Sequence, residues 1–185
     1  MAPLIYTALA SLDGYIEDDR GNFDFAFPDP EVHALANDLE ASTGTHLYGR
    51  GMYETMAVWQ DVTEGPEVSP EEVDFARTWR ELDKVVYSST LDEVWTPRTE
   101  LVREFDAAAL RDRLEAADRD VSISGPGLAQ HAFRAGLVDV VHLFLFPVIV
   151  GGGKPGLPRD VRLDLELVDE LRFTSGVVHL HLRTR

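Results

Sequence analysis

Segments typical of β-strands alternate with segments of helical spacing through the first two thirds of this chain. Parallel strands need a long crossover, usually a helix, so this alternation predicts an α/β fold with a largely parallel sheet. The expected strands are residues 4–10, 15–16, 45–48, 84–87, 101–103 and 121–124. The expected helices begin near residues 31, 51, 73, 107 and 128, and the first is expected to end at Gly44.

The last part of the chain carries strand patterns with no helix between them. A long extended run at 138–150 is followed by alternating segments at 161–168 and 177–182. Such segments are typical of antiparallel strands, so we expect antiparallel additions at one side of the sheet. No repeat or linker interrupts the sequence, and residues 1–185 are expected to form a single domain.

Neither a membrane span nor an export signal is expected. The sequence lacks an apolar run of the roughly 18 residues that a spanning helix needs. Residues 1–6 lack the basic and apolar segments of a secretory signal. There is no cysteine, which excludes disulfides, thiolate metal sites and a cysteine nucleophile, and which fits a reducing cytoplasm.

The charge balance restricts the class of ligand. The chain has 33 acidic and 17 basic residues, for a formal net charge of −16. Such a chain repels a phosphate backbone at long range, which argues against nucleic-acid binding. An anionic ligand would have to be held by a local group of arginines and backbone amides.

Two glycine turns and one run of hydroxyls provide such groups. Gly49-Arg50-Gly51 and Gly125-Pro126-Gly127 each stand between a strand and a helix, where backbone amides can bind phosphate. Ser88-Ser89-Thr90 follows a buried strand, at the sheet edge where open α/β proteins bind ligands. Each feature also has a plain structural reading, because glycine eases tight turns and hydroxyls cap them. Neither a complete G-x-G-x-x-G nor a Walker A pattern is present.

Segments spread over the chain resemble a known family. Residues 8–16, 48–54 and 86–91 resemble the dihydrofolate reductase superfamily. Residues 136–139, 146–148 and 151–153 resemble more specifically the reductase domain at the carboxyl end of bifunctional riboflavin-biosynthesis deaminase-reductases, and its stand-alone relatives. The resemblance implies a three-layer α/β/α fold, NADPH as cofactor, and hydride transfer to a pterin-like or riboflavin-precursor-like substrate.

The resemblance also assigns residues to the cofactor. These are Gly49 and Arg50 for the phosphates, Ser88 and Ser89 for the adenosine 2′-phosphate, Gly125 and Gly127 for the pyrophosphate, and Ala8 and Ile16 for the nicotinamide carboxamide. Pro126 departs from the family, which usually has a second glycine there, and removes one N–H donor. This departure leaves open a non-catalytic protein of the same fold that binds NADPH or another nucleotide.

Asp29 is the candidate catalytic residue. It stands where an acid binds the substrate and aids its protonation in the dihydrofolate reductases that the chain resembles. An acid beside Pro28 and Pro30 before a helix is, however, normally a helix cap. The two readings predict opposite results when Asp29 is replaced.

The last strand suggests a partner rather than a metal. Residues 177–182 are apolar on one face and carry His179 and His181 on the other. Without a third ligand these histidines predict no metal site and are more typical of a surface or interface pair. An edge strand at the end of a sheet must be covered, so we expect a homodimer formed through this strand.

Overall fold

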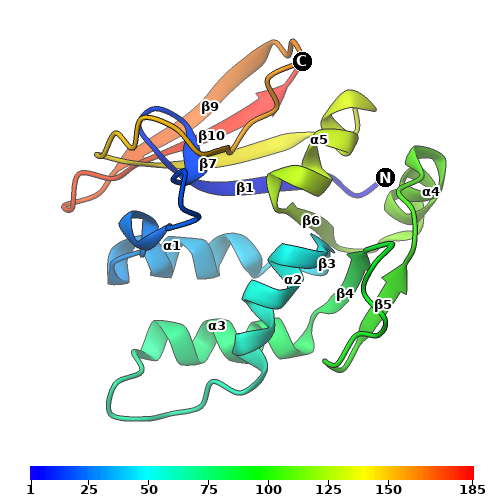
Figure 1. Cartoon of the computed structure of the whole chain (residues 1–185), viewed down its shortest axis with the longest axis horizontal. Helices are drawn as coiled ribbons and strands as arrows, with labels where there is room; N and C mark the ends of the chain where they lie inside the picture. The colour runs from blue at the N-terminus through cyan, green and yellow to red at the C-terminus, as the bar shows by residue number, and fades with distance from the viewer.

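One eight-stranded sheet forms the centre of the computed structural model, which describes residues 1–185. Its strands lie in the order β5-β4-β3-β6-β1-β7-β10-β9 (Figure 1). They are β1 Leu4–Ser11, β3 Thr43–Gly49, β4 Asp83–Tyr87, β5 Thr99–Val102, β6 Asp120–Ser124, β7 Val140–Phe146, β9 Leu165–Arg172 and β10 Val178–Thr184. A separate ladder pairs β2 (Tyr15–Glu17) with β8 (Lys154–Pro155).

The sheet is parallel over most of its width. β1 runs parallel to both of its neighbours, β6 and β7, and β3, β4 and β5 continue the parallel part beyond β6. β10 pairs antiparallel with β7 on one side and with β9 on the other. The predicted α/β fold, with a mostly parallel sheet and antiparallel carboxyl-terminal strands, is confirmed.

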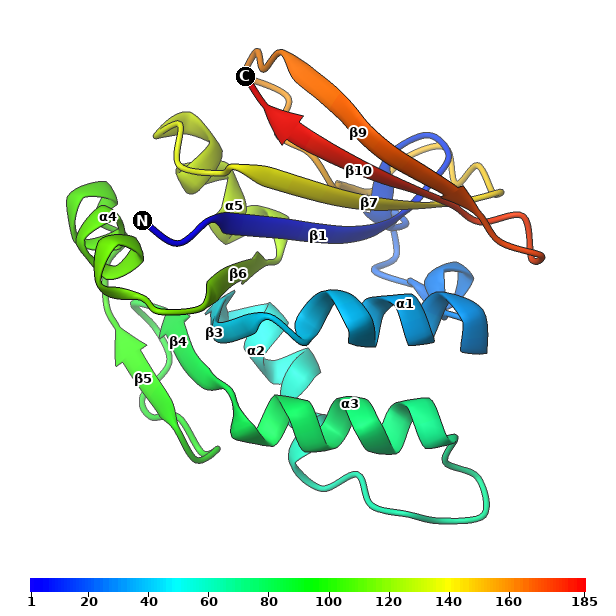
Figure 2. The same cartoon turned by 180° about the vertical axis from the view of Figure 1, so that it is seen from behind.

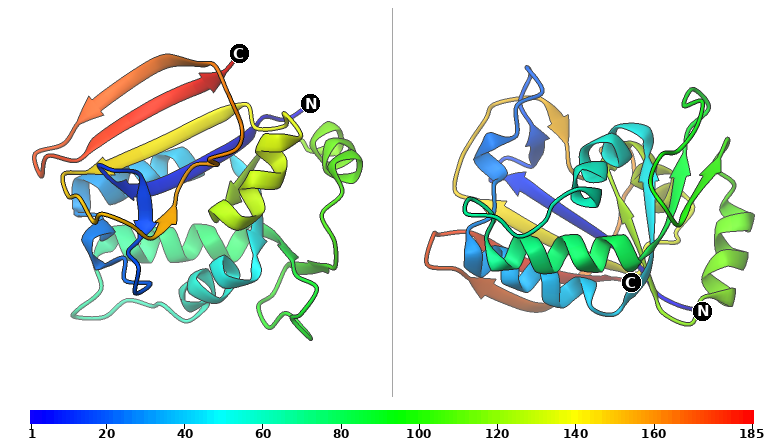
Figure 3. Two further views of the ribbon diagram at one scale, coloured as in Figure 1. Left: turned by 45° about the horizontal axis from the view of Figure 1, so that its top comes forward. Right: turned by 90° about the horizontal axis from the view of Figure 1, so that it is seen from below.

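Helices cover both faces of this sheet. The helices are α1 Pro30–Glu40, α2 Arg50–Met56, α3 Pro70–Glu81, α4 Ala107–Ala116 and α5 Pro126–Arg134, with short 3-10 helices at Asp24–Ala26 and Ala57–Gln60. α1 and α3 pack side by side on one face (Figure 2). α5 lies on the opposite face, as the left view of Figure 3 shows, and α2 stands near the ends of β3 and β4.

Side chains of β1 alternate between the two layers. Tyr6 and Ala8 pack with α5, where the Tyr6 ring meets Phe133 edge to face at a centroid distance of 5.3 Å. Leu9 points the other way and packs with the cluster around Phe144 on the α1 side. A central parallel strand is buried on both faces, which explains why β1 is a continuous apolar run in the sequence.

Each of the three long helices α1, α3 and α4 begins at a polar cap. The Asp29 carboxylate accepts a hydrogen bond from the Val32 amide at 2.9 Å at the start of α1. Ser69 and Glu72 form a reciprocal capping box at the start of α3. Asp106 caps α4. These bonds satisfy amides that have no partner inside the helix, so the polar residues set the positions at which the helices begin.

The predicted end of the first helix was wrong. α1 ends at Glu40, and Gly44 lies inside β3. A Cβ at Gly44 would stand 2.8 Å from Cβ of Arg119, so this glycine allows two chain segments to approach closely. A glycine that ends a helix and a glycine that allows close packing look alike in the sequence, and only the packing distinguishes them.

Two expectations about the last strands were also wrong. The strand expected at 161–168 is β9, Leu165–Arg172, while Leu163 precedes it and packs against the α5 core. The alternation covers 161–167 and breaks at Val168, whereas pairing with β10, whose register shifts between His181 and Leu182, extends the strand to Arg172. The strand expected at the edge, β10, lies inside the sheet, and β9 forms the edge because the chain folds back beside β10.

Candidate functional site

A cleft of about 340 Å³ opens at the carboxyl ends of β3, β4 and β6. Ligands bind at this edge in open α/β sheets. Six of the residues predicted from the sequence line the cleft together, although they come from three separate turns. They are Gly49, Arg50, Ser88, Ser89, Gly125 and Gly127.

The turn between β6 and α5 presents backbone amides to the cleft. Gly125 adopts a φ of +88°, and Pro126 takes the first helical position, where no intrahelical hydrogen bond is lost. The amides of Gly127 and Leu128 follow in the first turn, where N–H groups have no carbonyl partner within the helix. A Cβ at Gly127 would meet no atom within 4 Å. Pro126 therefore removes one donor and leaves two donors beside open space.

Arg50 connects α2 with the turn after β4. Its Nε donates to Oε1 of Glu54 at 2.8 Å, and its Nη1 donates to Oγ1 of Thr90 at 3.3 Å. Half of the Arg50 side chain is exposed. An exposed ion pair four residues apart on a helix contributes only about 0.3–0.5 kcal/mol, so Glu54 competes weakly with an incoming anion.

Ser88 shapes the turn that follows β4. Its Oγ accepts hydrogen bonds from the amides of Leu91 at 3.0 Å and Thr90 at 3.3 Å, which leaves its O–H as a donor. The guanidinium of Arg103 donates to the carbonyls of Ser88 at 3.4 Å and Asp92 at 3.2 Å. Arg103 therefore fixes the hydroxyl-bearing turn, a role that sequence reasoning missed.

Three further residues of the cleft were not predicted. Phe105, which precedes α4, and His131, in α5, stack with their ring centroids 5.4 Å apart and their planes 29° from parallel. Lys154, on β8, lines the same cleft. No spacing in the sequence joins these residues, because they come from segments that only the fold brings together.

Three predicted residues lie outside the lining of the cleft. Ala8 is buried in β1, and Ile16 packs at the side of the same core. Asp29 caps α1, and hydrogen bonds from the Ser175 side chain and the Val32 amide lower the pKa of its carboxyl group. A lowered pKa keeps this carboxylate ionised at neutral pH, which suits a helix cap and does not suit a proton donor.

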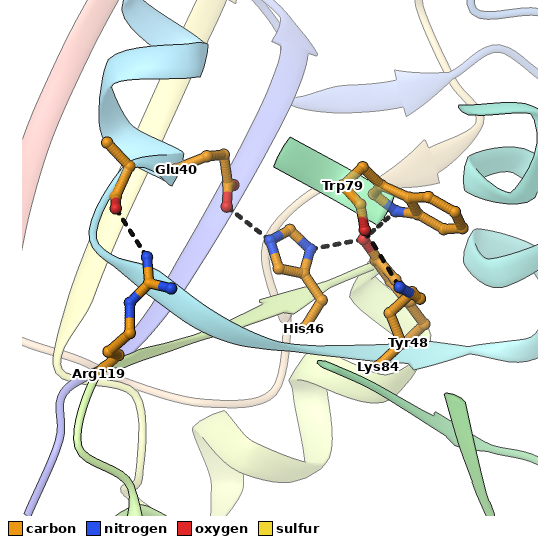
Figure 4. Close-up of polar contacts among 7 residues, drawn as sticks. Glu40, His46, Tyr48, Trp79, Lys84 and Arg119 are labelled. Carbon is orange, nitrogen blue, oxygen red and sulfur yellow. Dashed lines mark hydrogen bonds and ion pairs between the residues drawn. The ribbon is translucent and has the colours of Figure 1, made fainter. Parts of the chain in front are cut away.

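A chain of buried polar side chains lies under α1 and α3, away from the cleft (Figure 4). Trp79 Nε1 donates to the Tyr48 oxygen at 3.1 Å, and Tyr48 pairs with His46 Nδ1 at 2.5 Å. His46 Nε2 then reaches Oε2 of Glu40 at 2.6 Å. Every group has a partner when His46 is neutral with its proton on Nε2, an assignment made from the partners.

Burial and pairing perturb the ionisation of this chain. Burial raises the pKa of Glu40, but its pairing with the His46 ring outweighs burial and leaves that pKa lowered. Burial raises the pKa of Tyr48 well above its usual value. Tyr48 directly precedes Gly49. This row of buried polar side chains therefore anchors the end of β3, from which the β3–α2 turn starts.

Two basic residues satisfy backbone carbonyls around this chain (Figure 4). The buried Lys84 ammonium donates to the carbonyls of Trp79 at 3.1 Å and Leu82 at 2.7 Å, and burial lowers its pKa to about 8. Arg119 Nη2 donates to the carbonyl of Ala41 at 2.8 Å. These bonds cap the ends of α3 and α1, where carbonyls lack partners within the helix.

Three histidine rings lie against one another on β7 and β10. His142 Nδ1 lies 3.0 Å from His179 Nε2, and the rings of His142 and His181 are 4.6 Å apart. The expectation of a surface or interface pair was wrong for His179, which is buried beside Phe144. No group of His, Asp or Glu side chains in the structure is arranged to hold a metal ion. No helix is both long and apolar enough to cross a membrane.

Comparison with known proteins identifies the family. The profile of the RibD C-terminal domain family matches residues 2–179. The chain belongs to this family. It is also similar to the uncharacterized protein YyaP of Bacillus subtilis strain 168, with 27% identity over 180 residues that cover 96% of this chain and 92% of YyaP.

Several solved structures share this fold. A protein of Shewanella sp. PV-4 assigned to riboflavin biosynthesis aligns with a TM-score of 0.74 and 21% identity over 100% of this chain and 99% of that one. The Thermotoga maritima diaminohydroxyphosphoribosylaminopyrimidine deaminase/5-amino-6-(5-phosphoribosylamino)uracil reductase aligns at 0.69 and 17%, over 100% and 57%. Enterococcus faecalis dihydrofolate reductase, complexed with NADP(H), aligns at 0.64 and 12%, over 99% and 96%. The resemblance to dihydrofolate-reductase-like proteins is confirmed.

Proposed function

We propose that this protein is an NADPH-dependent reductase. The observation that carries the proposal is the convergence of Arg50, the Ser88–Ser89 hydroxyls and the amino terminus of α5 in one cleft at the strand ends. A cation, hydroxyl donors and free backbone amides are the groups that phosphates require. The open space at Gly127 leaves room for a dinucleotide along the helix start.

The residues of the cleft fit the parts of the cofactor. Arg50 with Ser88 and Ser89 would hold the 2′-phosphate, and the amides of Gly127 and Leu128 would hold the diphosphate. The stacked pair of Phe105 and His131 offers an aromatic surface to the adenine. When bound, the nicotinamide supplies a hydride for a carbonyl or imine carbon.

The protein's own contribution is to position the nicotinamide rather than to supply reactive groups. Backbone groups near Ala8, within β1, and Ile16, on β2, would orient the nicotinamide carboxamide. Both segments are held firmly, since the Tyr6 hydroxyl donates to the Gly156 carbonyl and the Gly156 amide donates to the Gly14 carbonyl at 2.9 Å. A fixed nicotinamide face is the main requirement for hydride transfer.

The substrate is proposed to be a small heterocycle of the riboflavin-precursor or pterin type. Asp29 is the proposed catalytic residue, beside the nicotinamide and the substrate. Because hydrogen bonds lower its pKa, an ionised Asp29 would orient the substrate, and water would deliver the proton.

A protein that binds NADPH or another nucleotide without turnover is the second candidate. The observation that favours it is the state of Asp29, whose carboxylate already serves the α1 amino terminus. Purified protein mixed with NADPH and a panel of pterins and aminopyrimidine riboflavin precursors distinguishes the two. Loss of NADPH absorbance with one of these compounds supports the reductase, and binding without oxidation across the panel supports the second candidate.

The oligomeric state and the cellular compartment are also part of the proposal. We infer that the reductase works as a homodimer in the cytoplasm. The absence of cysteine fits a reducing compartment. All eight residues of the edge strand β9 are exposed, which leaves a strand edge for a second copy to cover.

A further inference from the structure

Lys154 and Glu17 form an ion pair at the margin of the cleft. Lys154 Nζ lies 3.4 Å from Oε1 of Glu17, and both side chains are partly exposed. The two residues face each other across the β2–β8 ladder. At this distance the pair is held by charge rather than by a short hydrogen bond, and an exposed pair of this kind is weak.

The backbone that carries Lys154 is fixed against β2. Gly153 has a φ of +126°, and a Cβ there would stand 2.0 Å from the carbonyl oxygen of Glu17, so only glycine fits. The Asp13 carboxylate accepts hydrogen bonds from the amides of Val150 at 3.2 Å and Gly151 at 2.8 Å. The base of the Lys154 side chain is therefore set by the fold, and only its flexible stem can move.

Lys154 is the cation of the cleft with the most freedom to bind an anion. Arg103 is occupied by backbone carbonyls, and Arg50 contacts both Glu54 and Thr90. The other lysine of the chain, Lys84, is buried. In a chain with a formal net charge of −16, an exposed ammonium that lines a cleft with free amides is a specific feature.

We infer that Lys154 binds the nicotinamide-side phosphate of the dinucleotide, and that Glu17 holds the ammonium when no ligand is bound. This inference rests on the proposed function. β8 is paired with β2, which carries Ile16, whereas Ser88 and Arg50 stand at the ends of other strands. Lys154 therefore serves the phosphate nearest β2, and Glu17 and that phosphate compete for one charge.

The test compares three ligands with three variants. NADPH and NADH share both phosphates of the diphosphate, whereas adenosine 2′,5′-bisphosphate lacks the nicotinamide-side phosphate. Lys154→Met should weaken NADPH and NADH each by about tenfold, the value of one charge-assisted contact, and should leave the bisphosphate within about twofold. Glu17→Gln should tighten both dinucleotides, because the competing carboxylate is gone. Arg50→Ala is the matched control, which should weaken NADPH and the bisphosphate and spare NADH.

Binding is measured by calorimetry without substrate, so a phosphate on the substrate cannot produce the effect. Thermal unfolding of each variant checks the fold. Unchanged dinucleotide affinity in a folded Lys154→Met protein overturns the inference and leaves the proposed NADPH site untouched. An equal loss for the bisphosphate overturns the placement at the nicotinamide side. Failure of the unaltered protein to bind any of the three ligands instead overturns the proposed function.

Discussion

The guanidinium of Arg50 donates a hydrogen bond from Nη1 to Oγ1 of Thr90 over 3.3 Å. This contact joins the β3–α2 turn to the turn after β4, so a cation and a run of hydroxyls face one end of the cleft. No acidic residue lies between Tyr87 and Leu91 to prefer a ribose hydroxyl. The geometry therefore favours a phosphorylated ribose.

Cofactor choice follows from that contact. We expect NADPH to bind at least about tenfold more tightly than NADH, which is about 1.4 kcal/mol and within reach of one charge-assisted contact. Arg50→Ala should reduce the affinity for NADPH more than that for NADH. Fluorescence titration of both proteins measures the effect. Equal dissociation constants for the two cofactors in the unaltered protein would contradict the assignment of Arg50.

Replacement of Asp29 separates its two readings. If the carboxylate orients the substrate or takes part in proton transfer, Asp29→Asn should lower turnover by roughly a hundredfold, the low end of general acid–base assistance, with NADPH affinity nearly unchanged. A plain cap predicts retained activity and a stability loss of about 1 kcal/mol or less, since asparagine caps helices almost as well as aspartate.

Steady-state rates and thermal unfolding are both required for this variant. Full turnover in Asp29→Asn removes Asp29 from the catalytic assignment and leaves water or a neighbouring group as the proton source.

The fold and the cleft were predictable from the sequence to different degrees. β1 and the turns around Gly49 and Gly125 were predicted because apolar runs and strand-to-helix glycines are local signals. Lys154 and the ring pair of Phe105 and His131 were not, because their meeting depends on pairing between distant segments.

The errors in the last strands have a similar cause. The alternation of apolar and polar residues covers 161–167 and breaks at Val168, inside β9, so it does not determine where β9 begins or ends. A strand pattern also does not show which of two neighbouring strands lies at the edge of the sheet. The burial of His179 could not be predicted either, because its partner His142 lies on β7.

Stability should fall on mild acidification because of His142. Burial, and then the neighbouring His181 and His179, lower its pKa from 6.5 to about 4, with Glu40 acting in the opposite direction. The unfolded chain binds this proton first as the pH falls. Stability is therefore full above pH 6.5 and declines down to about pH 4, by as much as about 3 kcal/mol for His142 alone.

Urea unfolding at a series of pH values measures this decline. His142→Asn should flatten the curve between those pH values, while the loss below pH 4.5, where Glu40 and other carboxylates take up protons, should persist. A slope between pH 6.5 and 4 that is the same in both proteins would contradict the assignment to His142.

The edge of the sheet should form the homodimer. β9 carries exposed Leu167, Val168 and Leu171 and has no strand beyond it. Light scattering at micromolar concentration should give twice the chain mass of 20.6 kDa, and Val168→Glu should shift the protein to monomer. Glu170→Gln, on the same strand, is a control that should leave the dimer intact. A mass of one chain for the unaltered protein would exclude the dimer.

The central claim is that the cleft at the ends of β3, β4 and β6 binds NADPH, and Gly127 tests it most directly. Its missing Cβ faces open space, so Gly127→Leu fills the cleft without disturbing the core. We predict saturable binding of one NADPH per chain by the unaltered protein, and at least about a tenfold weaker affinity in Gly127→Leu at unchanged thermal stability. No binding by the unaltered protein, or equal affinity in both, would contradict the account.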